Sequence, residues 1–239
     1  MKLKNLILTL LAVPAMLFSS CEDKGGDNTG LIYTDIVTVE SIEPTSTTFT
    51  FREKENSALL TLIYAGDINK NLPDNTFKED TRIVISYKPN SGKHYASGTI
   101  SLIAASNIYG AGEAVPEVER EGMSDFMSSQ ISLNSLWRTG DYINAVFAAT
   151  TGKTPLKCEM VADAETLDND YPQIHLIFKP DESLTHQQYI FYMSYSLKDI
   201  FARSKCKGVE VFFNDPNMAA KSVTIKKTSG SFTPTTPTL

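Results

Sequence analysis

The chain has 239 residues, of which 41% are hydrophobic and 21% are charged, a balance typical of a globular protein and not of a disordered one. Its formal charge is −6 and it contains no extended run of lysine and arginine, so a nucleic-acid partner, which requires a basic surface, is not expected. The basic pair of note, Lys226-Lys227, is interpreted as a solvated strand end.

The first 20 residues are predicted to be a lipoprotein signal peptide. Two lysines precede an apolar run from Leu6 to Phe18, and Ser19-Ser20 come directly before Cys21. A basic start, a short apolar centre and small residues before the break are the ordered parts of such a signal, whereas a membrane-spanning helix needs about 20 apolar residues. Cys21 is therefore the predicted lipidation site and membrane anchor. The alternative is a plain secretory signal with an incidental cysteine.

Residues 21–32 are predicted to be a flexible tether. The stretch from Glu22 to Gly30 has no apolar residue, so it cannot bury surface to offset the entropy lost on ordering. Glu22 and Asp23 directly follow the cysteine and resemble the acidic export signals of Bacteroidetes lipoproteins. This resemblance implies a lipid-anchored protein of the outer membrane that is exposed on the cell surface, and a periplasm-facing anchor is the alternative.

Residues 33–105 are predicted to form a small closed β-barrel. Apolar residues recur there with a period of two, in short runs separated by turn residues. Five short strands in about 70 residues favour closure, because a closed barrel has no exposed edges. An OB-like barrel, the oligonucleotide- or oligosaccharide-binding type, has this strand count. The expected strands lie near residues 37–39, 48–51, 58–64, 81–87 and 94–103.

The rest of the chain is predicted to be an acidic linker at 106–126, an antiparallel β-sandwich at 127–228 and a disordered tail at 229–239. Glycine and glutamate dominate the linker, and an acidic active-site loop is the less favoured alternative there. The sandwich follows from about seven short strands with no convincing helix beyond one turn near 197–202. The tail holds two Thr-Pro pairs. The predicted fold class is therefore all-β, an OB-like five-stranded barrel followed by a sandwich.

The cysteines and histidines indicate no metal or redox chemistry. With Cys21 consumed by lipid, Cys158 and Cys206 are an even pair in an oxidising compartment, where they could form a disulfide. Two buried free thiols are the slightly favoured interpretation. The three histidines are scattered without metal-ligand spacing, so a zinc site is not expected. No cofactor is predicted.

Other candidate motifs are incomplete. The carboxylates between Asp163 and Asp170 lack the turn glycine of a calcium loop, and a solvated loop is expected. Gly152-Lys153-Thr154 matches the end of a phosphate loop, but the position of its first glycine holds Phe147. Trp137 and the tyrosines could stack on a sugar, although a lone tryptophan that opens an apolar strand is more commonly part of the core.

The segment Leu136-Trp137-Arg138-Thr139-Gly140-Asp141-Tyr142-Ile143-Asn144 resembles the NigD-like lipoproteins of Bacteroidetes. Further matching features are the Ser-Ser-Cys site with its acidic followers, an Arg-Ile-Val-Ile-x-Tyr strand at 82–87 and a Tyr-x-Phe-x-x-Ser-Tyr-x-Leu pattern that ends at Leu197. The resemblance covers nearly the whole mature chain and implies an OB-like domain followed by a β-sandwich. It implies no activity, cofactor or catalytic residue.

A lipid-anchored envelope protein without enzymatic activity is the function that these observations favour. We expect a binding or interaction module whose partner is a glycan, a peptide or another envelope protein. The first alternative is a glycan-processing hydrolase with a site built from loops, since glycoside hydrolysis needs two facing carboxylates that sequence alone cannot pair. The second alternative is a structural or assembly lipoprotein. The shape and residue lining of the groove between the two predicted domains would distinguish these hypotheses.

Overall fold

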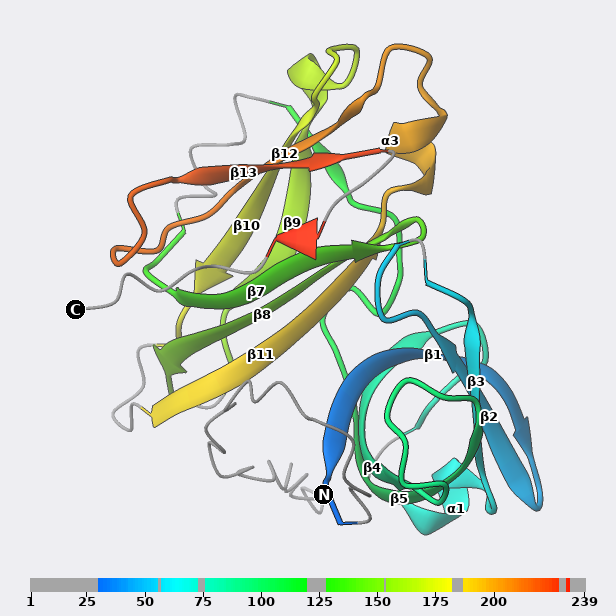
Figure 1. Cartoon of the computed structure of the whole chain (residues 1–239). Coiled ribbons are helices and arrows are strands. Elements are labelled where there is room, and N and C mark those ends of the chain that lie inside the picture. The colour runs from blue at the N-terminus through cyan, green and yellow to red at the C-terminus, as the bar shows by residue number, and fades with distance from the viewer. Residues whose placement is uncertain are drawn as a thin grey trace, which may run out of the picture.

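The computed structural model of the chain describes residues 30–55, 57–72, 76–119, 128–152, 154–181, 187–227 and 231–232 (Figure 1). The predicted signal peptide, the predicted lipidation site Cys21 and most of the predicted tether and tail lie outside these residues. Among the residues that are described, no helix has the length and apolar character needed to cross a membrane.

The described residues of the N-terminal half include a closed barrel of five strands, which confirms the predicted OB-like fold (Figure 1). Its strands are β1 (Tyr33–Glu43), β2 (Ser46–Phe51), β3 (Leu60–Tyr64), β4 (Arg82–Pro89) and β5 (Gly98–Asn107). They follow the order β1-β2-β3-β5-β4 around the barrel, and β4 pairs with β1 to close it. The β3–β5 pair is parallel and the other pairs are antiparallel.

Alternation along each strand fills the barrel. In β2, Thr47, Phe49 and Phe51 are buried, whereas the residues between them are half-exposed. The short helix α1 (Ile68–Asn71) lies at one end of the barrel and adds the fully buried Ile68 to its core (Figure 1). Asp67 caps this helix, because its side chain accepts from the backbone N–H of Asn69 at 2.9 Å.

The described residues of the C-terminal half form two sheets that face each other, as predicted. One sheet has the order β13-β12-β10-β9-β6 and the other β11-β8-β7-β14. Two pairs, β10–β12 and β6–β9, are parallel, which the sequence did not indicate. The strands are β6 (Glu117–Val118), β7 (Ser132–Thr139), β8 (Tyr142–Thr151), β9 (Lys157–Asp163), β10 (Gln173–Lys179), β11 (Gln187–Ser196), β12 (Gly208–Phe212), β13 (Ser222–Lys226) and β14 (Ser231–Phe232), with the short helices η2 (Ala164–Thr166) and α3 (Lys198–Ala202).

Aromatic side chains join the two sheets of the sandwich. The rings of Phe147 from β8 and Phe191 from β11 are stacked with centroids 5.2 Å apart. Phe178, from β10 in the facing sheet, meets Phe147 edge-on at 5.7 Å. All three are buried, and such ring pairs add about 0.5–1.5 kcal/mol each beyond the burial of their area.

The segment that follows β5 is attached to the sandwich by its backbone. Tyr109 pairs with Met193 of β11 in a parallel bridge, and Ala114 pairs in the same way with Ser196. Further along, β6 joins the edge of β9. These backbone pairings lie within the stretch predicted as a linker. A prediction based on apolar side chains cannot reveal them, because backbone groups form them. The same holds for β14, which lies within the predicted tail and pairs with β7.

The barrel and the sandwich are joined by buried contacts centred on Arg82. This side chain from β4 is 4% exposed and donates from Nη2 to Asn144 Oδ1 of β8 at 3.1 Å. Its guanidinium also lies 4.5 Å from the centre of the Tyr142 ring, and burial lowers its pKa to about 10. A second contact is the ion pair between Glu55 and Arg138. An apolar cluster completes the interface with Ile36, Val84, Ile108, Trp137 and Tyr192.

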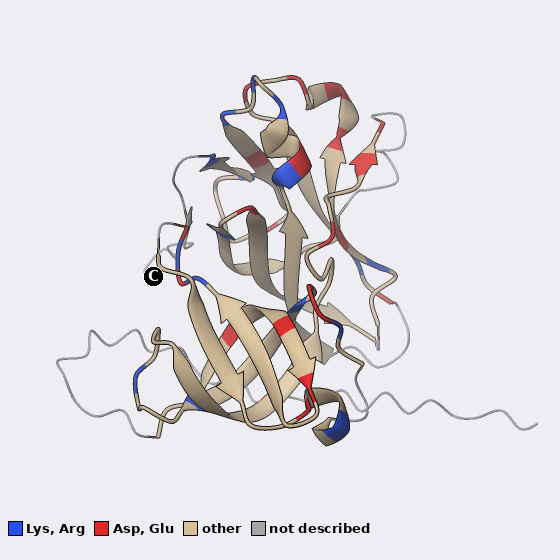
Figure 2. Ribbon diagram, turned by 90° about the vertical axis from the view of Figure 1, so that its right-hand side faces the viewer, with Lys and Arg blue, Asp and Glu red and all other residues tan. Residues whose placement is uncertain are grey.

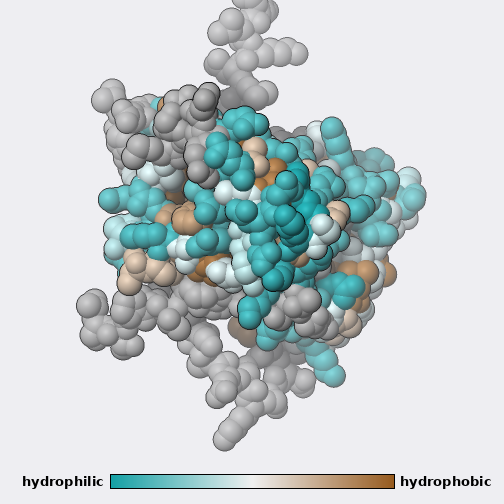
Figure 3. Space-filling view, turned by 90° about the horizontal axis from the view of Figure 1, so that it is seen from above, coloured by the Kyte–Doolittle hydropathy of each residue, from teal (hydrophilic) through white to brown (hydrophobic). Residues whose placement is uncertain are grey.

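Charge and hydropathy are mixed over the surface. Figure 2 shows acidic and basic residues interspersed over both halves of the described chain. In the view from above, hydrophilic side chains cover most of the described surface and apolar ones appear in small spots (Figure 3). Figure 2 shows no broad basic face among the described residues.

Candidate functional site: the groove between barrel and sandwich

A groove of about 230 Å³ runs between the barrel and strand β7 of the sandwich. The barrel contributes the start of β1, the end of β2 with the loop that follows, and the loop between β4 and β5. The sandwich contributes side chains from one strand. The lining residues are Asp35, Ile36, Phe51, Arg52, Glu53, Lys54 and Tyr95 from the barrel, and Ser135, Trp137 and Thr139 from β7.

Asp35 is the best-held carboxylate of this groove. Its Oδ2 accepts a hydrogen bond from the Tyr87 hydroxyl at 2.9 Å and lies 3.0 Å from His94 Nε2. The Asp35 side chain is 16% exposed. Burial, followed by the charge of Asp35 and the hydrogen bond to it, holds the pKa of Tyr87 above its ordinary value. The Tyr87 hydroxyl therefore stays protonated and continues to donate to the carboxylate.

Three aromatic rings are stacked beside Asp35. The His94 ring lies between Tyr33, with centroids 3.8 Å apart, and Tyr95, with centroids 3.6 Å apart. Tyr95 is 44% exposed, and its backbone has a φ of +53°, a left-handed conformation that is uncommon for a large residue and occurs preferentially at functional sites. The stack therefore holds an exposed ring at the groove.

The position of His94 and Tyr95 corrects the sequence prediction. Both were expected in a strand over 94–103, but β5 begins only at Gly98, and His94 and Tyr95 lie in the turn that precedes it. The prediction was wrong because it took Tyr95 as an apolar member of the strand, whereas Tyr95 lies in a turn. A left-handed backbone at Tyr95 is incompatible with a continuous strand.

The charges at the groove balance one another. The described lining residues include two acidic side chains, Asp35 and Glu53, and two basic ones, Arg52 and Lys54. Glu53 Oε1 lies 3.4 Å from Lys54 Nζ, and Arg52 donates to the backbone carbonyl of Ser57. Burial, followed by the nearby charges of Asp35 and Glu53, raises the pKa of Tyr95 to about 12, so its hydroxyl is neutral at physiological pH.

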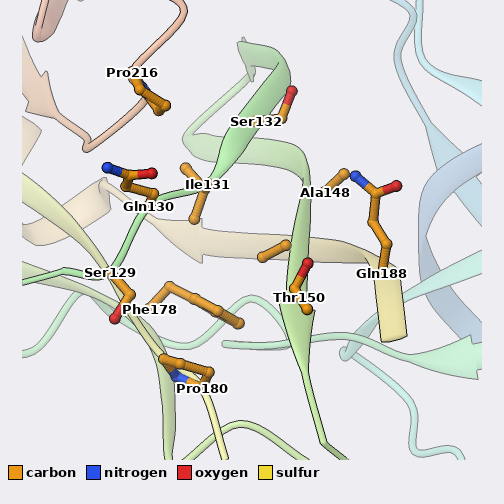
Figure 4. A pocket seen from close by; sticks show the side chains of 11 residues that line it. Ser129, Gln130, Ile131, Ser132, Ala148, Thr150, Phe178, Pro180, Gln188 and Pro216 are labelled. Carbon is orange, nitrogen blue, oxygen red and sulfur yellow. The ribbon is translucent and has the colours of Figure 1, made fainter. Parts of the chain in front are cut away.

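A second hollow of about 390 Å³ lies in the sandwich (Figure 4). Ser129, Gln130 and Ile131 line it from the segment before β7, Ala148 and Thr150 from β8, and Gln188 from β11. Its only aromatic lining residue among those described, Phe178, is 1% exposed. The described lining of this hollow includes neither a charged side chain nor an exposed aromatic ring. We therefore place the candidate site in the groove.

The sequence-predicted site residues lie elsewhere. Cys21 is outside the described residues. Cys158 and Cys206 are both buried free thiols, and burial raises the pKa of the Cys158 thiol above its ordinary value. Cys206 Sγ donates to the carbonyl of Gly208 at 3.2 Å. The two thiols therefore belong to the sandwich core.

The acidic stretch from Asp163 to Asp170 is a set of caps and ion pairs. Asp163 caps η2, Asp168 pairs with Arg203 at 3.3 Å, and Asp170 pairs with Lys207 at 2.5 Å. No group of three or more potential metal ligands gathers anywhere in the described part of the chain.

Solved structures of similar fold come from Bacteroidetes. One is a "protein of unknown function DUF1344" from Bacteroides vulgatus, with 17% sequence identity and a TM-score of 0.57 over 82% of this chain and 90% of that one. Another is a NigD-like immunity protein from Bacteroides caccae, with 12% identity and a TM-score of 0.54 over 85% of this chain and 97% of that one. This chain shares its fold with a NigD-like protein. The resemblance inferred from the sequence motifs is thereby confirmed, and identities this low show the fold alone. No protein-family model and no curated protein matches the chain.

Sequence reasoning missed most of the groove. Asp35 lies 52 residues from Tyr87 and 59 from His94, and their meeting depends on how β1 pairs with β4 in the closed barrel. Trp137 was singled out, and it lies half-buried at the interface and lines the groove. Tyr95 could have been suspected from its place between Ser91-Gly92 and Gly98, since glycine and serine mark a loop.

Proposed function

We propose that this chain is a non-catalytic, lipid-anchored protein of the cell envelope that holds a ligand in the groove between barrel and sandwich. The groove is supported as a site because both halves build it, and ligand sites occur preferentially where domains meet. The buried contacts of Arg82 with Asn144 and Tyr142 keep its two walls together.

The observation that carries the proposal is the exposed Tyr95 ring. A soluble protein gains stability by burying aromatic surface, yet Tyr95 is 44% exposed and its backbone is left-handed. The His94 and Tyr33 rings fix its position, so little side-chain entropy is lost when a ligand covers it. An exposed, preordered ring in the same groove as Trp137 is suited to binding.

The two carboxylates at the groove support binding over catalysis. Asp35 is fixed by two hydrogen-bond partners on one oxygen, and Glu53 is paired with its neighbour Lys54. A retaining or inverting glycoside hydrolase needs one carboxyl group that acts as a proton donor. Asp35 and Glu53 both come from the barrel side of the groove, so they do not flank a bound chain from opposite walls, as a pair of hydrolytic carboxyl groups does.

Binding to envelope material tests the proposal. Full-length protein purified in detergent is captured on beads and mixed with fluorescently labelled envelope fragments from Bacteroides cells. We expect Tyr95→Ala and Trp137→Phe to weaken retention of the fragments by roughly tenfold, as is common for aromatic contact residues. Tyr171, an exposed tyrosine outside the groove, supplies the matched control Tyr171→Ala. Equal retention by all four proteins would refute the groove as the binding site.

A hydrolase is the second candidate, because Asp35 and Glu53 both line the groove. If it is correct, the full-length protein releases reducing ends from envelope polysaccharide, and Asp35→Asn and Glu53→Gln each abolish that release. Under the binding proposal, the wild-type protein releases no more reducing ends than the Asp35→Asn variant does. The Glu53→Gln variant then still retains the envelope fragments on the beads.

A further inference from the structure

We infer that the groove binds an uncharged saccharide, one of whose sugar rings lies against Tyr95. This inference rests on the proposed binding function and names the chemical class of its ligand. It is drawn from the aromatic stack, the charge balance of the lining, the available hydrogen-bonding groups and the strand pairing at Trp137.

The Tyr95 ring is partly covered by the stack. It lies against His94 at a centroid distance of 3.6 Å, and because the residue is still 44% exposed, part of its surface is open to a ligand. Half-buried Trp137 adds further aromatic surface to the same groove, whereas Phe51, 6.3 Å from Tyr95 and tilted by 39°, is only 4% exposed. Flat aromatic rings match the flat, apolar C–H face of a sugar ring, whereas a branched aliphatic side chain needs a pocket.

The lining favours a ligand without net charge. Its two acidic and two basic side chains sum to zero among the described lining residues, and their main contacts are within the protein. An ionic ligand would lose water on entering this partly buried groove without gaining an unpaired counter-charge. Anionic polysaccharides, nucleic acid and strongly charged peptides are therefore disfavoured.

Hydroxyl groups of a sugar find partners along both walls. The Tyr95 phenol is neutral at physiological pH and can donate and accept. Ser135 contributes a hydroxyl from β7. Thr139 also lines the groove, but it is buried and its Oγ1 accepts from Asn144 Nδ2 at 3.0 Å. Asp35 accepts both of its hydrogen bonds on Oδ2, and within the described residues Oδ1 accepts none, so it is open to a ligand hydroxyl.

Strand pairing argues against an extended peptide at this place. Peptides commonly bind by adding a strand to a free sheet edge. At Trp137 both edges of β7 are occupied, since Trp137 pairs with Asn144 of β8 on one side and with Ser231 of β14 on the other. The groove therefore offers side chains and not a free backbone edge.

Affinity electrophoresis tests the ligand class with defined probes. Full-length protein in detergent is run through native gels that contain neutral polysaccharides (starch, yeast mannan, barley β-glucan or galactomannan) or the anionic dextran sulfate and polygalacturonate. We expect retardation by at least one neutral polysaccharide and by neither anionic one. Tyr95→Ala should raise the apparent Kd by roughly tenfold or more, Tyr95→Phe by less than about threefold because the ring is kept, and Tyr171→Ala should match the wild type.

The inference would be overturned by a lack of retardation by any neutral polysaccharide, by stronger retardation by an anionic one, or by an equal loss of binding in Tyr171→Ala. Because Trp137 also packs in the interface cluster, its substitution is made as Trp137→Phe, and each variant is used only at temperatures where its thermal unfolding has not begun. Loss of binding in Trp137→Phe without loss in Tyr95→Ala would place the sugar elsewhere and would also contradict the inference.

Treated envelope fragments separate this inference from the proposed function. A saccharide ligand survives proteinase K and is destroyed by periodate, which cleaves vicinal diols, so retention on the beads should follow that pattern. Retention that is lost after proteinase K and kept after periodate would identify a protein partner. The saccharide would then be excluded, and the groove would remain the binding site as long as Tyr95→Ala still weakens retention.

Discussion

At the scale of single residues, Tyr87 shows how the barrel core is connected to the groove. Its ring is 1% exposed and packs in the barrel core, while its hydroxyl reaches Asp35 at the surface of the groove. Asp35 in turn holds His94, which holds Tyr95. The exposed ring is therefore positioned by a chain of contacts that begins in the core.

Removal of the Tyr87 hydroxyl tests this chain of contacts. A hydrogen bond to a charged group contributes about 1.5–3 kcal/mol, so we expect Tyr87→Phe to lower the free energy of unfolding by that amount at pH 7. Urea unfolding followed by circular dichroism measures it, with Tyr171→Phe as the exposed control. Equal stability of Tyr87→Phe and the wild type would show that the hydroxyl does not hold Asp35.

Buried acidic groups also predict how stability depends on pH. Burial raises the pKa of Tyr195 and Tyr109 to about 12 and holds the pKa of Tyr87 and Cys158 above their ordinary values. The native state keeps these protons at a pH where the unfolded chain, with ordinary pKa values of 10.0 for tyrosine and 9.0 for cysteine, releases them. Protons bound more tightly in the native state make stability fall as pH rises.

We therefore expect these groups to make their full contribution to the free energy of unfolding below about pH 9. As pH rises further, that free energy should fall by up to about 1.4 kcal/mol per pH unit for each fully buried group. Urea unfolding at pH 7, 9 and 11 measures the loss, and Tyr87→Phe should reduce its slope because one such proton is gone. A free energy of unfolding that is the same at pH 9 and pH 11 would contradict this expectation.

At the scale of elements, the segment after β5 depends on Gly110. This residue has a φ of +76°, and a Cβ there would lie 2.5 Å from the Tyr195 ring and 2.7 Å from the Ser194 carbonyl oxygen. Gly140, in the β7–β8 turn, has a φ of +60° but nothing within 4 Å of its Cβ position. The two glycines therefore separate the cost of a left-handed backbone from the cost of close contact.

Alanine at these two positions gives a matched comparison. Gly140→Ala should lose about 1–2 kcal/mol, the cost of a left-handed conformation. Gly110→Ala should lose about 3 kcal/mol or more, because overpacking adds about 1–3 kcal/mol. Chemical denaturation of both variants provides the measurement. Equal losses would mean that the segment moves away from β11 without cost.

The sequence predicts elements better than it predicts contacts between them. The barrel strands are visible as alternating runs because one face of each is buried, and β2 follows the expected residues. Two-residue strands such as β6 and β14 contain too few side chains to show a period, and only backbone pairing defines them. The link between Asp35, Tyr87 and His94 depends on strand register, which no local pattern reveals. This is why the fold class was predicted and most of the residues that line the groove were not.

At the scale of the whole molecule, the two halves form the walls of the groove, which we propose as one site at the end of a tether. Cys21 is the proposed anchor, and its test is the uptake of labelled palmitate followed by partition into Triton X-114. We expect the wild-type protein to be labelled and to enter the detergent phase, and Cys21→Ala to be unlabelled and to appear in the soluble fraction. Cys158→Ala is the matched cysteine control. Palmitate uptake by Cys21→Ala, or its retention in the membrane, would refute lipidation at this residue.

Trp137 offers the most direct test of the groove, because it is the one tryptophan of the chain and it lines the groove. Full-length protein in detergent is titrated with a soluble extract of the envelope fragments, while emission and acrylamide quenching of Trp137 are recorded beside retention on beads. We expect emission to shift to shorter wavelengths and quenching to fall with the same half-saturation as binding, and Tyr95→Ala to require roughly tenfold more extract. Binding that saturates with no change in Trp137 emission or quenching would place the ligand outside the groove and contradict the proposal.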